Sequence, residues 1–285
     1  PQNIKDKPDL VVVSAAYNKD HPEVKEAYKR RIEIKPLSEF LAMIAHDYQM
    51  IAVAGIHGKT TTTALISFLL SKANLNPSYI IGAGEISVLE NTSHLGQGEY
   101  LVVEADEYRK SAESNESKFH DLSPQIEIIT GIEMDHPDMF PSEEKIYQAF
   151  YKFACRTPRS AFIVLCTDYP KSYKLLNSLA DRNFETYGFK TGAAWQVIDY
   201  EEQEDYSQFF LLNQTKKIGP FKIKIPGTGN VLNATAAIIV ALKLGIEEKN
   251  IKKYLPSFYG VKRRFEKIGQ VGSLTVIDDY AHHPR

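Results

Sequence analysis

The sequence has 285 residues, of which 43% are hydrophobic and 25% charged, and its formal net charge is −2. This is an ordinary globular composition, and it gives no electrostatic reason to expect nucleic acid or an anionic membrane as a partner. No apolar run approaches the ~20 residues that span a bilayer. The two cysteines, Cys155 and Cys166, are too few for a disulfide framework or zinc site, so we expect reduced thiols in a cytoplasmic protein.

The spacing of apolar residues predicts alternating strands and helices along the chain. In chain order we expect a strand (10–14), two helices (21–31 and 37–47), a strand (49–55), a helix (64–73), three strands (79–83, 100–106 and 125–136), a helix (143–155), a strand (161–166), a helix (170–180), antiparallel strands within 194–225 and a buried helix (230–246). The predicted fold class is therefore α/β, with a mostly parallel central sheet flanked by helices and a small antiparallel flap.

A glycine turn at 55–60, "GIHGKT", joins the strand at 49–55 to the next helix, and three further threonines follow it. Backbone N–H groups and the positive end of the helix dipole favour an anion there. Gly58 lets a phosphate approach, Lys59 reaches its terminal oxygens, and the Thr60 hydroxyl suits Mg²⁺. The turn is shorter than the usual P-loop pattern, because Val53 stands where the first glycine belongs. The alternative is a glycine turn with a surface lysine.

Two other predicted strands end in polar residues. Glu104 opens an acidic run, 104–107, and a second polar group at 133–136 ends in His136. Ligands of open α/β sheets bind at the carboxyl ends of strands, and carboxylate and hydroxyl oxygens suit Mg²⁺. Histidine is a less usual Mg²⁺ ligand. Both groups could instead be solvated loops.

Together these segments resemble motifs of the Mur ligase family of peptidoglycan synthesis. The similar segments are "GIHGKTTTT", "VVEADEY", "ITGIEMDHPDMF", "GNVLNATAAI", "GVKRRFE" and "IDDYAHHP", in the family's order across residues 51–284. Three positions depart from the family pattern: Ile56 replaces a threonine, Gly131 an asparagine and Gly229 a histidine. The ordered series is far more specific than any single motif.

The resemblance implies an ATP-dependent amide ligase that works through an acyl phosphate, with ATP and Mg²⁺ as cofactors. It implies that Lys59 holds the β- and γ-phosphates and that Arg264 binds the γ-phosphate. Thr60 and Glu104 would hold one Mg²⁺, and His136 would help to hold a second. The implied nucleotide-binding residues are Gly55, His57, Gly58, Lys59, Thr60, Thr61, Asn230, Asn233, Arg264 and Asp279.

Some of these roles have simpler alternatives. The resemblance implies that Asn230 and Asn233 face the adenine and that Asp279 faces the ribose. Helix capping would also explain an asparagine, and it suits Asn230 better than Asn233. Arg264 could belong to a basic surface turn. No step is assigned to His282 or His283.

The family has three domains, and the resemblance implies that this chain holds only part of them. Residues 1–47 would be the C-terminal part of the UDP-binding domain, 48–277 the central ATP-binding domain and 278–285 the start of the C-terminal domain. Because both ends break off close to a predicted strand, we expect a longer protein. Some Mur ligases carry a carbamylated lysine on the helix at 143–155. Phe150 stands at that position, and Lys152 should face elsewhere.

Within the family, "RRFE" and "DDYAHHP" resemble members that join L-alanine to UDP-N-acetylmuramate, a step in cell-wall formation and so in cell shape and division. Members that attach a murein tripeptide to the same sugar nucleotide share both motifs. "HDLSP" favours L-alanine, whereas "EADEY" together with "SKF" at 117–119 favours the tripeptide. A non-catalytic nucleotide-binding module is a third alternative. The oligomeric state is not readable from the sequence.

Overall fold

The computed structural model describes residues 2–4, 8–203 and 206–280. Its strands are β1 (Leu10–Val13), β2 (Glu33–Pro36), β3 (Gln49–Ala54), β4 (Ser78–Ile80), β5 (Ser93–His94), β6 (Tyr100–Glu104), β7 (Ile126–Ile129), β8 (Phe162–Cys166), β9 (Asn183–Gly188), β10 (Trp195–Glu202), β11 (Ser207–Asn213), β12 (Lys216–Ile223), β13 (Glu266–Val271) and β14 (Leu274–Asp278).

The helices are mostly placed between these strands. They are α1 (Pro22–Lys29), α2 (Leu37–Ile44), α3 (Lys59–Lys72), α4 (Glu143–Arg156), α5 (Pro170–Ser178), α6 (Thr228–Lys243) and α7 (Glu248–Tyr254), with short 3-10 turns η1 (Gln2–Ile4), η2 (Ala45–Asp47), η3 (Lys118–Asp121) and η4 (Leu255–Ser257). Within the described residues, none of these helices is long and apolar enough to cross a membrane.

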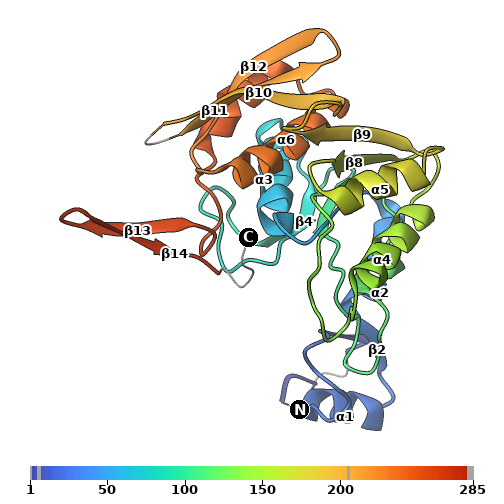
Figure 1. Ribbon diagram of the computed structural model, residues 1–285. Coiled ribbons are helices and arrows are strands. Elements are labelled where there is room, and N and C mark those ends of the chain that lie inside the picture. Colours follow the sequence, from blue (N-terminus) through green and yellow to red (C-terminus); the bar gives the residue numbers. More distant parts are fainter. Residues whose placement is uncertain (1, 5–7, 204–205, 281–285) are drawn as a thin grey trace.

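The described residues form one ten-stranded sheet in the order β12-β11-β10-β9-β8-β7-β3-β6-β4-β5. From β4 through β10 the neighbouring strands are parallel. Strand β5 at one edge, and β11 and β12 at the other, run antiparallel to their neighbours. The predicted α/β class, with a mostly parallel sheet and an antiparallel flap, is confirmed (Figure 1).

The central strand β3 explains how the layers form. Ile51 and Val53 pack into a cluster with α3 and α6, whereas Met50, Ala52 and Ala54 pack into another with α2 and α4. Successive side chains of a strand point to opposite faces, so an entirely apolar strand must be covered on both sides. The sheet is therefore the middle layer of three.

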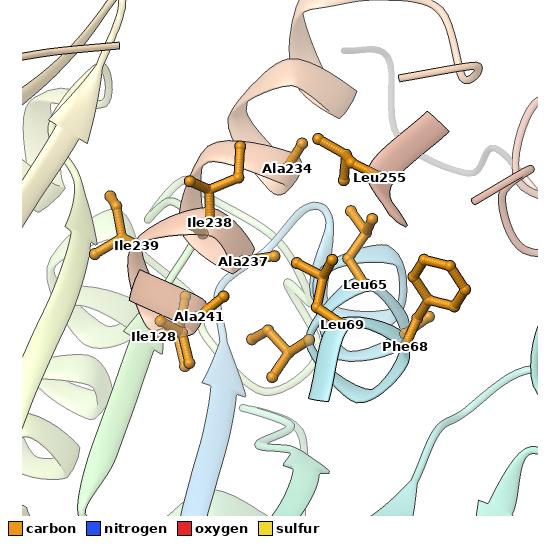
Figure 2. Packing of buried hydrophobic residues seen from close by; sticks show 14 of the residues in the cluster. Leu65, Phe68, Leu69, Ile128, Ala234, Ala237, Ile238, Ile239, Ala241 and Leu255 are labelled. Atoms are coloured by element: carbon orange, nitrogen blue, oxygen red, sulfur yellow. The ribbon is translucent and has the colours of Figure 1, made fainter. Parts of the chain in front are cut away.

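Helices α3 and α6 pack against each other on one face of the sheet (Figure 2). Leu65 and Leu69 of α3 lie toward Ala234 and Ala237 of α6, and all four are buried. Small side chains at a helix contact allow a short distance between the axes. This packing brings the first turn of α6 beside the first turn of α3.

Several boundaries differ from the sequence prediction. The strand predicted over 125–136 ends at Ile129, and the next residue, Thr130, donates its hydroxyl to the carbonyl of His57. Helix α6 begins at Thr228, two residues earlier than predicted. The patterns do not predict β2, β5, β9, α7 or β13, which are short or rich in polar residues. Apolar spacing carries little signal in such segments.

Two parts of the chain lie outside the main sheet (Figure 1). Strands β1 and β2 pair in parallel and share a small core of Ile4, Ala27 and Ile32 with α1. Strands β13 and β14 form a hairpin, and its residues Val271 and Leu274 are 73% and 71% exposed. The hairpin thus contributes little to the main core.

Glu127 places a carboxyl group in the centre of the sheet. It lies on β7 between Ala52 of β3 and Ile163 of β8, and none of it is exposed. The Thr157 hydroxyl donates to one of its oxygens. Burial raises the pKa of Glu127 to about 8, and Thr157 and Arg182 counter this only in part. The folded protein therefore keeps this carboxyl group protonated at neutral pH.

The raised pKa makes stability depend on pH. Unfolded, the group ionises near 4.5, so the folded chain holds an extra proton between about 4.5 and about 8. The free energy of unfolding therefore falls as pH rises through that window, by on the order of 3–5 kcal/mol. Glu127→Gln removes this dependence. We expect the melting temperature of the variant, relative to that of the wild type, to increase as pH rises. The measurement is thermal unfolding followed by circular dichroism. A difference that stays constant with pH would contradict the raised pKa.

Candidate active site

The turn between β3 and α3 depends on two glycines. Gly58 is the N-cap of α3 with φ +78°, and Gly55 has φ +125°. A Cβ on Gly55 would lie 2.1 Å from Thr130 Oγ1, and one on Gly58 would lie 2.1 Å from Asn233 Oδ1. Neither position accepts a side chain without strain or displacement of a neighbour. The short G-x-x-G-K-T turn is thus held from both sides, by the segment after β7 and by α6.

A cavity of about 740 Å³ opens at the carboxyl ends of β3, β6 and β7. All of the predicted site residues except Gly55 line it: His57, Gly58, Lys59, Thr60, Thr61, Glu104, His136, Asn230, Asn233, Arg264 and Asp279. The structure therefore brings together residues that lie up to 222 positions apart in the sequence (57 to 279). Gly55 shapes the turn instead of facing the cavity.

Lys59 is the central cation of the site. Its Nζ donates to the Gly55 carbonyl at 2.7 Å and lies 3.0 and 2.9 Å from the two carboxylate oxygens of Glu107. Burial alone would lower the pKa of Lys59, but the charge of Glu107, with smaller contributions from Asp106 and Glu104, raises it above the ordinary value. Lys59 is therefore a firmly charged ammonium group in a largely buried position, and the alternative of a surface lysine is wrong.

Thr60 and Glu104 form an oxygen-rich corner of the cavity. The Thr60 hydroxyl donates to Glu104 Oε2 at 3.2 Å, and the Gly82 N–H donates to Oε1 at 2.6 Å. Burial raises the pKa of Glu104, and the Gly82 bond and Lys59 offset part of that rise. Hydroxyl and carboxylate oxygens in contact are the donor set that Mg²⁺ prefers. These two residues fit such an ion.

The four threonines at the start of α3 have two different tasks. Thr60 and Thr61 line the cavity. Thr62 and Thr63 are fully buried, and their hydroxyls bond to Asn233 Oδ1 at 3.2 Å and to the Lys59 carbonyl at 2.8 Å. Only the first two threonines are therefore placed to offer a hydroxyl to a ligand. The other two join α3 to α6 and close the first turn.

His136 lies on the loop after β7 in a left-handed backbone conformation, with φ +51°. Its Nε2 is 3.2 Å from Glu107 Oε1, and its ring packs on Tyr108 with centroids 4.9 Å apart. The hydrogen bond to Glu107 raises the pKa of His136. Among the described residues, no group of three or more His, Cys, Asp and Glu side chains is arranged as a ready metal site. A second Mg²⁺ at His136 stays a prediction.

Asn230 and Asn233 do not cap α6, so the capping alternative is wrong. The helix begins at Thr228, and its N-cap is Gly227. The Asn230 amide donates to the Pro226 carbonyl at 2.8 Å, and the Asn233 amide donates to Asn230 Oδ1 at 3.3 Å. Both side chains are therefore fixed beside the glycine turn by bonds within the protein.

Arg264 and Asp279 reach the cavity from the segments on either side of the β13–β14 hairpin. Arg263 and Phe265 flank Arg264 with φ values of +60° and +53°, and the Arg264 guanidinium lies 5.6 Å from the centre of the Tyr280 ring. Left-handed residues at a site commonly mark a backbone held in position for a function. The predicted His282 and His283 lie outside the described residues.

Several residues that line the cavity were not individually predicted from the sequence as site residues. They are Ile56, Gly82, Asp106, Glu107, Asp135, Glu202, Pro226, Gly227, Gly229 and Phe265. The acidic run at 104–107 was the available signal for Asp106 and Glu107, but spacing could not show which carboxylates face inward. Glu202 comes from the antiparallel flap, where no motif points to the site.

Two departures from the family pattern have different structural settings. A Cβ on Gly131 would lie 2.6 Å from Cε2 of Tyr169, so that ring takes the space that an asparagine side chain would need. Around Gly229 nothing lies within 4 Å of the Cβ position, and nothing in the structure explains the absence of a histidine there.

Helix α4 presents no lysine to the cavity among the described residues. Phe150 is fully buried, and its ring meets that of Phe119 edge to face with centroids 5.3 Å apart. Lys152 is exposed to solvent. The prediction that Lys152 faces elsewhere is confirmed, and the assignment of Phe150 to the position of that lysine stays a prediction.

Comparison with known proteins matches the chain to two models of one family. The model described as "Mur ligase middle domain" covers residues 53–241, and the one described as "Mur ligase family, catalytic domain" covers residues 1–49. The first match alone spans most of the chain, from the end of β3 to near the end of α6.

Individual relatives point the same way. The UDP-N-acetylmuramate–L-alanine ligase of Syntrophotalea carbinolica is 38% identical over 97% of this chain. The crystal structure of the UDP-N-acetylmuramate–alanine ligase of Thermotoga maritima superposes over 98% of the chain with a TM-score of 0.81 and 28% identity, covering 61% of that structure. A murein peptide ligase from Psychrobacter arcticus covers 99% with a TM-score of 0.78 and 26% identity, and 62% of its own chain is matched. The chain spans 58% of the Syntrophotalea relative's length. With this glycine turn, this cavity and these matches, the chain belongs to the Mur ligase family.

Proposed function

We propose that the protein is an ATP-dependent ligase that joins L-alanine to the carboxylate of UDP-N-acetylmuramate, in peptidoglycan synthesis. The observation that carries this proposal is the single cavity that gathers Lys59, Thr60, Glu104, His136 and Arg264. Relatives at 36–39% identity with that activity in their names support the choice of substrates.

The cavity of about 740 Å³ includes the start of α3, and this supports ATP as its ligand. Its phosphates would lie over the start of α3, where N–H groups and the helix dipole favour negative charge. Asn230 and Asn233, beside the same turn, would face the adenine, and Asp279 would face the ribose. His57 and Thr61 would complete the phosphate surroundings. These placements follow the family pattern and the cavity lining.

The charge on the wall favours Mg²⁺ with the nucleotide. Six lining carboxylates, Glu104, Asp106, Glu107, Asp135, Glu202 and Asp279, face two permanent cations, Lys59 and Arg264. Such a wall would repel a bare triphosphate, because like charges at short range raise the energy of binding. Thr60 and Glu104 would hold one ion and His136 would contribute to a second. When bound, these ions neutralise charge on the phosphates and on the substrate carboxylate.

In the first chemical step, the carboxylate of UDP-N-acetylmuramate attacks the γ-phosphorus of ATP. A carboxylate–phosphorus bond forms, the bond to the β-phosphate oxygen breaks, and ADP leaves behind an acyl phosphate. Two anions must meet, so the main requirement is electrostatic stabilisation of the transferring group. Lys59 would bind the β- and γ-phosphates from the start of α3. Arg264 would bind the γ-phosphate from the opposite wall.

In the second step, the neutral amine of L-alanine attacks the acyl carbon to give a tetrahedral intermediate. That intermediate expels inorganic phosphate and leaves the amide, and the amine gives up a proton. Lys59 and Arg264 would still face the departing phosphate, which keeps negative charge throughout. The described residues therefore serve mainly to bind and neutralise phosphate.

The chain would hold parts of three domains. We propose that residues 1–47 end a UDP-binding domain, 48–277 form the ATP-binding domain and 278–285 begin the domain that holds the amine. The two free cysteines suit a reducing compartment, and we place the reaction in the cytoplasm.

A ligase for a murein tripeptide is the second candidate. The similarity to the Psychrobacter murein peptide ligase and the segment "EADEY" favour it. A non-catalytic nucleotide-binding module is disfavoured, because such a module has no need for Glu104 and His136 beside Lys59 and Thr60.

The choice of amine is tested on the full-length protein by amine-dependent phosphate release. We expect kcat/KM for L-alanine to exceed that for the tripeptide by about tenfold or more, since specificity is a ratio of these values. Both amines are compared on one preparation with saturating ATP and UDP-N-acetylmuramate. A higher value for the tripeptide would select the second candidate, and no release with either amine would reject ligase activity.

Lys59→Ala should abolish ligation while the protein stays folded. Lys59 contributes to a buried pair, but its main proposed task is to stabilise the transferring phosphate, so we expect a loss of about 10²-fold or more in kcat. Phosphate release and circular dichroism measure the two properties separately. A folded variant with a near-normal rate would remove Lys59 from the mechanism.

His136→Ala should raise the Mg²⁺ concentration needed for half-maximal rate and lower the rate itself, with partial recovery at high Mg²⁺ or Mn²⁺. The reason is that a lost metal contact is partly replaced by a higher metal concentration. The measurement is the phosphate-release rate across a metal titration for both proteins. If His136 acted as a general base, one limb of the pH–rate profile would flatten and added metal would restore nothing.

A further inference from the structure

Glu107 is a fully buried carboxylate to which the proposed reaction gives no direct task. It follows β6 by three residues, and none of its side chain is exposed. Both of its oxygens lie within 3.0 Å of Lys59 Nζ, and Oε1 is also 3.2 Å from His136 Nε2. One side chain thus joins the glycine turn, the end of β6 and the loop after β7.

The first consequence concerns Lys59. An ammonium group has three N–H donors on a flexible four-carbon stem. The Gly55 carbonyl and both Glu107 oxygens lie within 3.0 Å of Nζ, so three acceptors surround the ammonium group. Lys59 also lines the cavity, so its positive charge stands at the cavity wall. Glu107 therefore fixes where the positive charge stands.

The second consequence concerns His136. A carboxylate beside Nε2 favours the tautomer that carries its hydrogen on Nε2, which leaves the Nδ1 lone pair open. The residue has φ +51°, a conformation that persists only when neighbours hold it. The backbone N–H of His136 donates to Asp135 Oδ1 at 2.7 Å, and the Tyr108 ring packs against the imidazole. The contact between Glu107 Oε1 and Nε2 fixes the imidazole ring itself.

We propose that Glu107 is a positioning residue that sets the Lys59 ammonium and the His136 imidazole in their places for ATP. This rests on the proposed function insofar as ATP is the ligand. It acts through those two side chains and does not touch the nucleotide.

A competing electrostatic effect would raise ATP affinity when Glu107 is removed. Glu107 is an anion near the phosphate position, so its removal would also relieve repulsion of ATP. Positioning should dominate, because Glu107 is itself buried and its charge is already matched by Lys59 at 2.9 Å. Without the carboxylate, the lysine loses two of its three acceptors and is held by the Gly55 carbonyl alone.

The first test compares the affinity of ATP with that of adenosine, both in Mg²⁺, by calorimetry on the full-length protein. For Glu107→Gln we expect ATP affinity to fall by about tenfold or more, the range seen when a supporting residue is lost. Adenosine affinity should not change, since adenosine has no phosphate to meet Lys59. A general loss of structure would weaken both ligands. Glu127→Gln, which removes another fully buried carboxylate, is the matched control and should leave both affinities unchanged.

A second test asks whether Glu107 acts through Lys59. In a Lys59→Met background, Glu107→Gln should weaken ATP binding little further, because the group that it positions is gone. The same loss in both backgrounds, or tighter ATP binding in the single variant, would overturn the proposal. If Glu107→Gln does not fold, Glu107→Asp carries the test, since it keeps the charge but withdraws it from Lys59, and ATP alone should weaken.

Binding does not require an amide to form, so these outcomes are separate from those of the proposed function. A protein that binds ATP through Lys59 and Glu107 but joins neither amine would reject the ligase and keep the role of Glu107. If the protein is a ligase but its ATP and adenosine affinities fall together in Glu107→Gln, the proposed function stands and the role of Glu107 is rejected.

Discussion

The parallel pairing of β3 between β6 and β7 is the constraint on which the site depends. Parallel neighbours end at the same edge of a sheet, so the three segments that leave these strands must meet. They carry the glycine turn, the acidic run and the loop of His136. Because β3 is buried on both faces, a one-residue slip of its register would exchange the side chains that pack in the two core clusters. The packing of the core therefore fixes the positions of the residues that line the cavity.

Two buried carboxylates show how a partner decides what burial does. Glu127 and Glu107 are both without exposed surface. Glu127 accepts a hydrogen bond from a hydroxyl, which offsets only part of the cost of burying its charge. Burial therefore raises the pKa of Glu127 to about 8. Glu107 meets an ammonium group, and the pair in turn raises the pKa of Lys59. A lone carboxyl in the sheet is therefore a site of pH-dependent stability, whereas the paired one organises charge.

The sequence was informative where one short segment carries the whole signal. The turn at 55–60 needs only its own glycines, lysine and threonine, and the direction of Lys152 needs only its place on a helix, so both could be predicted. Glu107 could not be distinguished from Glu104, because both belong to one acidic run at the end of β6 and only the fold decides which carboxylate meets Lys59. Asn233 was placed at the site by resemblance, but its bond to Thr62, 171 residues away, is a product of helix packing.

That packing also explains why threonine suits the start of α3. Helix propensity favours other residues there, and β-branched side chains restrict the turn. Each hydroxyl, however, has a partner or a cavity: Thr60 meets Glu104, Thr62 meets Asn233, and Thr63 meets the Lys59 carbonyl. An alanine at Thr62 would fit the helix better, yet it would leave the buried Asn233 oxygen with one donor fewer. Because Asn233 Oδ1 also stands where a Cβ on Gly58 would lie, loosening it would free the same turn that holds Lys59. The threonines therefore serve the site by fixing the helix that covers it, as much as by facing a ligand.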